Sequence, residues 1–223
     1  LIAVAMSDTL TSKRFFELYE RLNEDVSLND TFVLGDLKYA LPEETSQWIE
    51  SMDWDVEIKR LQEKRVKVLT VLDGGYPQRL KEIYLPPIVL FYRGNLSLIN
   101  QRAVAIVGSR DHSKYAKECI HELIPPIVND GIVVVSGLAR GVDTLAHEET
   151  LKNTIAVIGS GLDVVYPPEN ANLYDMIAKR GLLLSEYPLE SRPLKFHFPY
   201  RNRIIAGLSH GVCVIEAKEK SGS

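Results

Sequence analysis

Five apolar residues, at positions 103–107, run without a polar break and lead directly into Gly108-Ser109-Arg110. A strand covered by helices on both faces carries such a continuous run, whereas a half-exposed strand alternates apolar and polar residues. The run therefore predicts a central parallel strand, with the Gly-Ser-Arg loop at its carboxyl end. Open α/β sheets bind their ligands at that end.

The same pattern returns four times along the chain. Apolar runs at 132–135, 155–158, 182–184 and 212–215 are each followed by a polar or glycine-bearing loop, and helical stretches separate them. This succession predicts an α/β fold with a mostly parallel sheet and helices on both faces. Two further runs, 66–73 and 88–92, should extend the sheet. Three glycine-bearing loops would then gather on one edge, which we take as the functional surface.

Prolines and glycines set the expected ends of the helices. Apolar residues recur at helical spacing from Tyr115 to Val128, but Pro125-Pro126 interrupts them, so this helix should kink or stop near Ile124. The other helices of this part are expected at 141–151, 169–179 and 198–205.

Residues 1–62 differ from the rest and read as a small helical domain. Amphipathic stretches near Phe15 and from Trp48 to Leu61 are separated by polar breaks. We place the boundary near residue 63, so that 63–223 forms the α/β domain. The helical part shows no constellation of reactive side chains and reads as a packing or interaction module.

Composition limits the class of protein. The net charge of −4 argues against a general polyanion binder, so a nucleic-acid site must be a local basic patch. Cys119 and Cys213 lie in apolar patterns, as reduced core thiols of a cytoplasmic protein do. No signal segment or membrane-spanning run is evident. The last apolar run, 212–215, is of the buried type with nothing after it to cover it, so we expect the native protein to continue.

Neither a cofactor nor a catalytic centre is predicted. The dinucleotide fingerprint needs glycines at the first, third and sixth positions of one turn; the turn at Gly108 has only the first, and the turn at Gly159 has only two. No phosphate-binding G-x-x-x-x-G-K-[ST] loop occurs. Asp143 and His147 lack a third metal ligand and more simply share a local hydrogen bond. Without paired carboxylates or a nucleophile with its base, the edge is suited to holding a ligand, not transforming it.

The Gly108-Ser109-Arg110 loop suits an anion. A short loop leading into a helix presents backbone N–H groups at the positive end of the helix dipole, and arginine adds a planar, permanently charged fork. The alternative is that Ser109 and Asp111 only cap a helix and Arg110 is solvated. The position at the ligand-binding edge favours phosphate.

A second feature lies at 192–203, where four cations, three aromatic residues and a histidine occur within twelve residues. Cations interleaved with rings suit single-stranded nucleic acid, because charges follow the backbone while rings stack on bases. The rings could instead belong to the core, and the arginines could pair with Asp143, Asp163 or Glu186. For Arg203, on a helix, that structural role is at least as good; Lys195, in an irregular loop, is the better ligand.

Six ordered motifs resemble the DNA-processing protein A (DprA, also called Smf) family. They are AIVGSR at 105–110, VSGLARGVD at 135–143, IGSGLDVVYP at 158–167, LSEYP at 184–188, FHFPYRNRIIAG at 196–207 and SGS at 221–223. The resemblance runs from about Asp73 to the end, and the first sixty residues only loosely resemble the sterile-alpha-motif-like domain of many members.

The resemblance implies an extended Rossmann-like domain that binds single-stranded DNA without modifying it. It also implies protection of incoming strands in natural transformation, displacement of single-strand-binding protein, loading of the RecA recombinase, and a homodimer. The DNA-binding residues it implies are Gly108, Ser109, Arg110, Gly137, Arg140, Gly161, Lys195, Phe196, Arg201, Asn202 and Arg203. The alternative is a nucleotide-processing enzyme of the phosphoribohydrolase type, whose P-G-G-x-G-T signature is absent.

Overall fold

The computed structural model describes residues 14, 15, 17 and 41–217. The helix expected around Phe15 and the motif at 221–223 lie largely or wholly outside these residues. Phe15 itself is buried in the same apolar cluster as the sheet residues.

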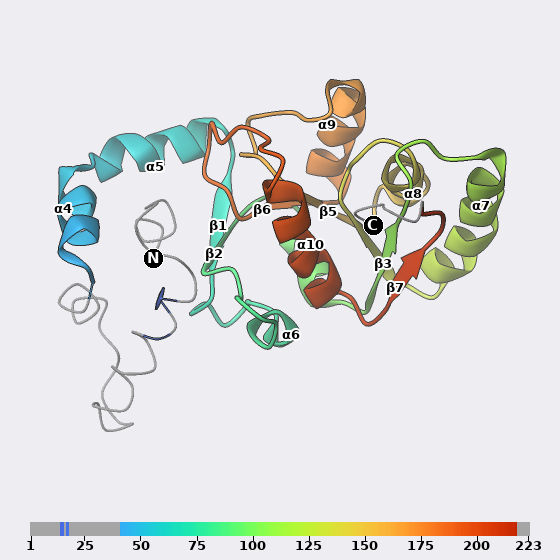
Figure 1. Cartoon of the computed structure of the whole chain (residues 1–223), viewed down its shortest axis with the longest axis horizontal. Helices are drawn as coiled ribbons and strands as arrows, with labels where there is room; N and C mark the ends of the chain where they lie inside the picture. Colours follow the sequence, from blue (N-terminus) through green and yellow to red (C-terminus); the bar gives the residue numbers. More distant parts are fainter. Residues whose placement is uncertain (1–13, 16, 18–40, 218–223) are drawn as a thin grey trace.

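Seven strands form a single sheet in the order β1-β2-β6-β5-β4-β3-β7 (Figure 1). Their bounds are β1 Lys67–Thr70, β2 Val89–Gly94, β3 Ala103–Val107, β4 Val133–Ser136, β5 Thr154–Ile158, β6 Leu182–Ser185 and β7 Val212–Val214. Strands β6, β5, β4, β3 and β7 pair in parallel, whereas β2 pairs antiparallel with both β6 and β1. The predicted α/β fold with a mostly parallel sheet is confirmed, including the two early strands that extend it.

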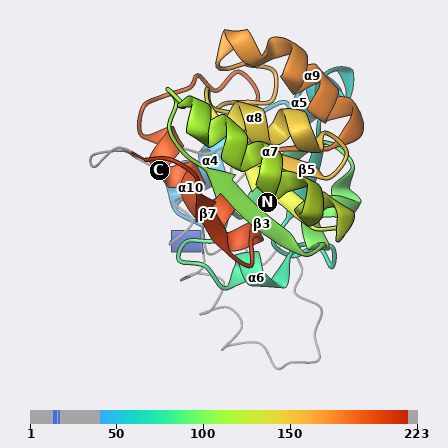
Figure 2. The same cartoon turned by 90° about the vertical axis from the view of Figure 1, so that its right-hand side faces the viewer.

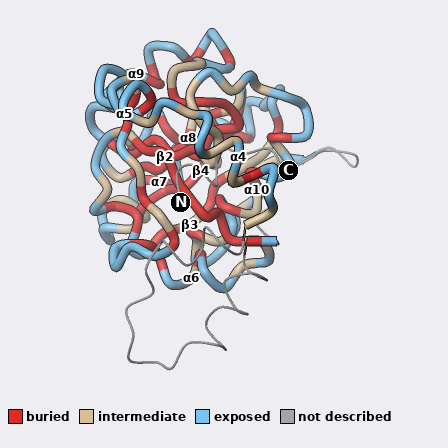
Figure 3. Tube along the Cα trace, turned by 90° about the vertical axis from the view of Figure 1, so that its left-hand side faces the viewer, coloured by how far each residue is buried: buried red, intermediate tan, exposed pale blue. Residues whose placement is uncertain are grey.

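Helices cover both faces of the sheet. Val133 and Val135 of β4 face the apolar side chains of α10 (His197–Leu208). Val134 faces the opposite way, toward α7 (Lys114–Asn129) and α8 (Val142–Thr150). Figure 2 shows α7 and α8 on one side of β3, and α10 with the short α6 (Gln78–Lys81) on the other. Because both faces are covered, β4, β5 and β6 are buried along their whole length. Figure 3 shows the buried parts of the chain gathered at the centre of the molecule.

The remaining helices complete the layers and the amino-terminal region. Helix α9 (Ala171–Arg180) packs on β2 and β6, and the one-turn helices η1 (Leu96–Asn100) and η2 (Pro168–Asn170) lie in connections. Helices α4 (Glu43–Ser51) and α5 (Trp54–Glu63) divide the single amphipathic stretch expected there, with Asp53 capping α5. Leu61 packs into the same core as the sheet, and the domain boundary near residue 63 stays a prediction.

Helix α7 does not stop near Ile124, which is one of the two outcomes expected from Pro125-Pro126. It continues through Pro125 and Pro126 to Asn129. Both prolines are exposed, as are His121 and Glu122, whose carbonyls lose their usual donors four residues on. Those carbonyls therefore face water, while Ile124 packs inward and keeps the helix on the sheet.

Strand β7 is an apolar run whose outward-facing residues are exposed in this structure. It lies at the edge of the sheet beyond β3, with Val212 54% and Val214 48% exposed. Cys213 and Ile215 point the other way and pack against the cluster under α7. Cys119 and Cys213 are both free thiols, as expected, and are only partly buried. In the part of the chain that the structure describes, no helix is long and apolar enough to cross a membrane.

Candidate nucleic-acid interface

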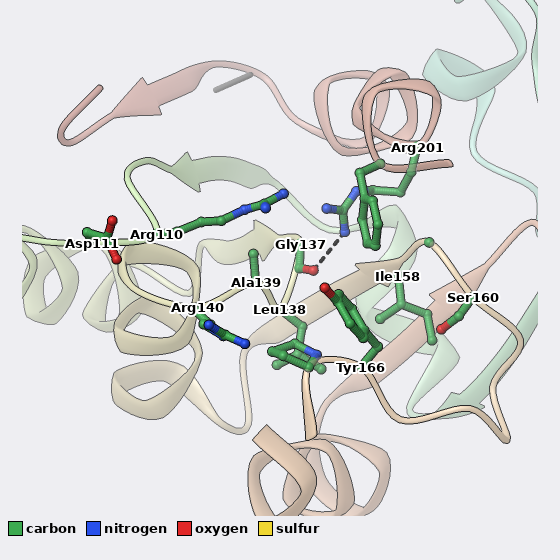
Figure 4. Close-up of a pocket in the computed structure, with 13 residues that line it drawn as sticks. Arg110, Asp111, Gly137, Leu138, Ala139, Arg140, Ile158, Ser160, Tyr166 and Arg201 are labelled. Carbon is green, nitrogen blue, oxygen red and sulfur yellow. Dashed lines mark hydrogen bonds between the residues drawn. The ribbon is translucent and has the colours of Figure 1, made fainter. Parts of the chain in front are cut away.

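A pocket of about 280 Å³ opens at the carboxyl ends of the central strands. The residues that follow β3, β4 and β5 line it, together with Tyr166 and the first turn of α10 (Figure 4). Its lining residues are Arg110, Asp111, Gly137, Leu138, Ala139, Arg140, Ile158, Gly159, Ser160, Tyr166, Pro167, Phe198 and Arg201. The predicted meeting of the glycine-bearing loops on one edge is therefore what the structure shows.

The Gly108-Ser109-Arg110 loop is fixed by its own backbone. Ser109 donates its N–H to the Glu216 carbonyl at 2.6 Å, and its own carbonyl accepts from Val142 N at 3.1 Å. A side chain on Gly108 would meet Val142, so this residue packs and does not line the pocket. Arg110, the last residue of the loop, is exposed and points into the pocket (Figure 4). The loop thus holds one cation at the mouth.

The loop does not itself begin α7, which corrects the helix-dipole argument. Ser113 caps that helix by accepting from Ala116 N at 3.2 Å, and its own N–H donates to the Glu216 carboxylate at 2.8 Å. Ser109 Oγ hydrogen-bonds within the loop, to the backbone of Asp111. A carboxylate therefore already occupies the amino end of α7, and the cationic side chains are the groups that favour an anion in the pocket.

Arg201 lies at the back of the pocket and is buried. Its guanidinium donates to the carbonyls of Gly137, at 2.7 Å, and Val157, so it ties the ends of β4 and β5 together. Burial lowers the pKa of Arg201, and the carboxylate of Asp143 partly offsets this. Figure 4 shows the guanidinium groups of Arg201 and Arg110 pointing toward one another. Arg201 is thus a structural residue whose charge still faces the pocket.

Asp143 and His147 do not share the hydrogen bond expected from their spacing. Asp143 accepts from the N–H groups of Gly137 and Ala139, at 3.1 and 3.3 Å. His147 Nδ1 contacts Thr154 Oγ1 at 2.7 Å. Burial raises the pKa of Asp143, against the effect of Arg201, and lowers the pKa of His147 to about 3. The aspartate therefore shapes the loop after β4, and the histidine is neutral.

Arg140 stands at the rim of the pocket and forms an ion pair with Glu169 at 2.9 Å. Both side chains are more than half exposed, so the pair is weak in water. Arg140 is therefore only weakly held by its carboxylate partner.

The basic–aromatic segment divides into exposed and structural members. Lys195 is exposed, as predicted, and Phe196 is exposed too, so its ring does not belong to the core. Arg203 donates two hydrogen bonds to Glu186, at 2.6 and 2.7 Å. This is the pairing with a carboxylate that the sequence offered as the alternative to a DNA contact. Asn202 is partly buried on α10, and Gly161 bonds to Ser191 away from the pocket lining.

Two aromatic residues complete the pocket and were missing from the candidate residues. The Phe198 ring lies 6.0 Å from the guanidinium carbons of both Arg110 and Arg201, and its centroid is 5.5 Å from that of Tyr166. Phe198 belongs to the basic–aromatic segment, and Tyr166 follows the glycine loop after β5, so both stood within recognised motifs. What the sequence could not show is that they meet.

The family described as DNA recombination-mediator protein A matches residues 67–223, which include every strand of the sheet and the whole pocket. The chain belongs to this family. Among its relatives is the DNA processing protein DprA of Streptococcus pneumoniae, 54% identical over 69% of this chain and 55% of the relative. The DprA of Bacillus subtilis is 46% identical over 72% and 56%, and the Smf protein of Escherichia coli 41% over 66% and 41%.

Solved structures of family members share the fold. DNA processing protein A from S. pneumoniae superposes with a TM-score of 0.86 at 41% identity, over 100% of this chain and 78% of that one. The protein from Helicobacter pylori, described with a single-stranded DNA binding mode, gives 0.65 at 35% identity over 71% and 72%. The chain spans about half the length of the curated relatives it matches. In residues 14, 15, 17 and 41–217, no cluster of three or more His, Cys, Asp or Glu side chains could hold a metal ion.

Proposed function

We propose that this protein binds single-stranded DNA at the carboxyl edge of its sheet and does not modify it. The observation that carries the proposal is the cationic, ring-lined pocket, in which Arg110, Arg140 and Arg201 surround Phe198 and Tyr166. Cations match the phosphate backbone, and rings accept bases without regard to sequence. Asp111 is the one carboxylate among the described lining residues, so the pocket lacks the pair that acid–base chemistry on a nucleotide uses.

The strand would reach beyond the pocket to Lys195 and Phe196, which are exposed just before α10. Phe196 contacts His197 edge-on at 4.7 Å, and His197 Nδ1 donates to the carbonyl of Gly159, which lines the pocket. The two groups of ligands are therefore parts of one surface. Gly108, Ser109, Gly137, Gly161 and Arg203 support it by packing or pairing.

We infer the wider role from the relatives. The S. pneumoniae relative is a DNA processing protein, and the H. pylori protein has a single-stranded DNA binding mode. As the family resemblance implies, the protein would protect incoming strands during transformation, displace single-strand-binding protein and load RecA as a homodimer.

Fluorescence anisotropy with a labelled, unstructured oligonucleotide tests this proposal, with the duplex and a mononucleotide as controls. We expect single strands to bind more tightly than duplex, and log affinity to fall with log salt with a slope of roughly −0.7 per phosphate contacted. Equal affinity for duplex, indifference to salt, or reproducible turnover of the mononucleotide would overturn it.

A further inference from the structure

Helix α10 presents two aromatic rings on its outer side, away from the pocket. Phe196 is 68% and Tyr200 38% exposed. The Tyr200 N–H donates to the Phe196 carbonyl at 3.4 Å, so the two residues lie on successive helical turns. Side chains so spaced are neighbours, with Cβ atoms about 5–6 Å apart. The two exposed rings therefore lie one helical turn apart on the same side of the helix.

The Tyr200 ring is held in place from behind. The guanidinium carbon of Arg203 lies 4.1 Å from the ring centroid, and the same guanidinium donates twice to the Glu186 carboxylate. The Glu186 and Arg203 side chains are each only 15% exposed, so this arrangement is largely shielded from water. A ring fixed on one face and open on the other loses little conformational freedom when a flat ligand stacks on it.

We propose that Phe196 and Tyr200 form a second stacking subsite, which takes the bases that follow the nucleotide held in the pocket. The inference rests on the proposed single-strand binding and adds Tyr200 to it. Phe198 and Phe196 lie on different sides of the start of α10, so a strand leaving the pocket crosses the amino end of this helix. Lys195 is exposed there and supplies the charge for the phosphate between the two subsites.

The ligand at this surface is a nucleic-acid base and not an apolar protein segment. The rings stand beside an exposed cation and continue the path that leads from the pocket. Both rings have polar neighbours. His197, the residue after Phe196, stacks on Tyr187 with ring centroids 3.8 Å apart, and the Arg203 guanidinium lies over the Tyr200 ring. Such a surface matches a strand with alternating charge and flat rings better than a wholly apolar helix.

The test compares an unstructured oligonucleotide with an abasic strand of the same length in the anisotropy assay. Tyr200→Ala should weaken binding of the oligonucleotide roughly fivefold or more, the lower end of what one stacked base contributes. It should leave binding of the abasic strand within about twofold. Phe196→Ala should do the same, and Tyr200→Phe should bind like the parent. Tyr84→Ala is the matched control, because Tyr84 is 80% exposed and precedes β2.

The outcomes separate this proposal from the previous one. If the parent fails to bind the oligonucleotide at all, the proposed function fails. If the parent binds but Tyr200→Ala and Phe196→Ala bind as tightly, or weaken both strands equally, the stacking subsite is wrong. Thermal melting shows whether each variant is folded. If Tyr200→Ala is unfolded, Phe196→Ala alone decides whether the stacking subsite exists.

Discussion

Replacing Arg201 by leucine tests whether this arginine holds the pocket together. The change leaves the carbonyls of Gly137 and Val157 without their donor and removes the cation nearest to buried Asp143. Each lost partner of a buried carbonyl costs about 1–3 kcal/mol, and Asp143 loses a favourable electrostatic interaction as well. Because these contributions overlap, we expect a loss of about 3–5 kcal/mol in the free energy of unfolding at pH 7.

The loss should depend on pH in a definite direction. Burial raises the folded-state pKa of Asp143 above its unfolded value, so its charge destabilises the fold at pH 7, and this penalty disappears as pH falls through the folded pKa. Without Arg201 the pKa rises further and the penalty at pH 7 grows. The cost of Arg201→Leu should therefore be smaller in mildly acidic buffer than at pH 7, and Asp143→Asn in the same chain should remove most of this pH dependence.

Urea unfolding followed by circular dichroism measures both effects. Arg192→Leu is the matched control, since Arg192 is exposed in the same segment and should change stability by no more than about 0.5 kcal/mol. A loss below about 1 kcal/mol for Arg201→Leu, or one that grows in acid, would refute the structural role of this residue.

Three further predictions concern the same edge. Gly137→Ala should lower the melting temperature at a cost of about 1–3 kcal/mol, because its Cβ would lie 2.5 Å from the Arg201 guanidinium; an unchanged melting curve would contradict this. Glu169→Gln should tighten single-strand binding by roughly two- to fivefold at low salt, because it frees Arg140, and the gain should vanish in an Arg140→Gln background. His147 has its pKa lowered to about 3 in the fold, so its share of stability is present above pH 6.5 and is lost as pH falls toward 3; His147→Leu should flatten the acid limb of stability against pH, and an unaltered limb would argue against it.

The sheet and the edge that carries the pocket could be predicted because their signals are local. A continuous apolar run followed by a glycine loop fixes both the strand and the end at which ligands gather. The exposure of Arg110 and Lys195 also follows from their places in loops. These features need no knowledge of distant contacts.

Whether Arg201 is buried or exposed depends on which side of α10 faces the sheet. Arg201 lies on the same side as His197, Ile204, Ile205 and Leu208, all of them buried. The helical spacing of these buried residues can be seen in the sequence. A run of cations, however, suggests a face exposed to solvent. Only the carbonyls of Gly137 and Val157 explain why the Arg201 charge is buried. In the same way, Pro125-Pro126 is tolerated because the helix turns that side to water.

Charge reversal at Arg110 and Lys195 tests the central claim most directly. The two residues are far apart in the sequence and both lie exposed at the carboxyl edge, so Arg110→Glu and Lys195→Glu should leave stability within about ±0.5 kcal/mol. Each should strongly weaken the anisotropy signal of a labelled single strand, because it removes a phosphate partner and adds a repelling charge, and the double variant should nearly abolish it. Lys59→Glu on α5 should bind almost like the parent. Folded Arg110→Glu and Lys195→Glu variants that bind the strand as tightly as the parent would place the site elsewhere.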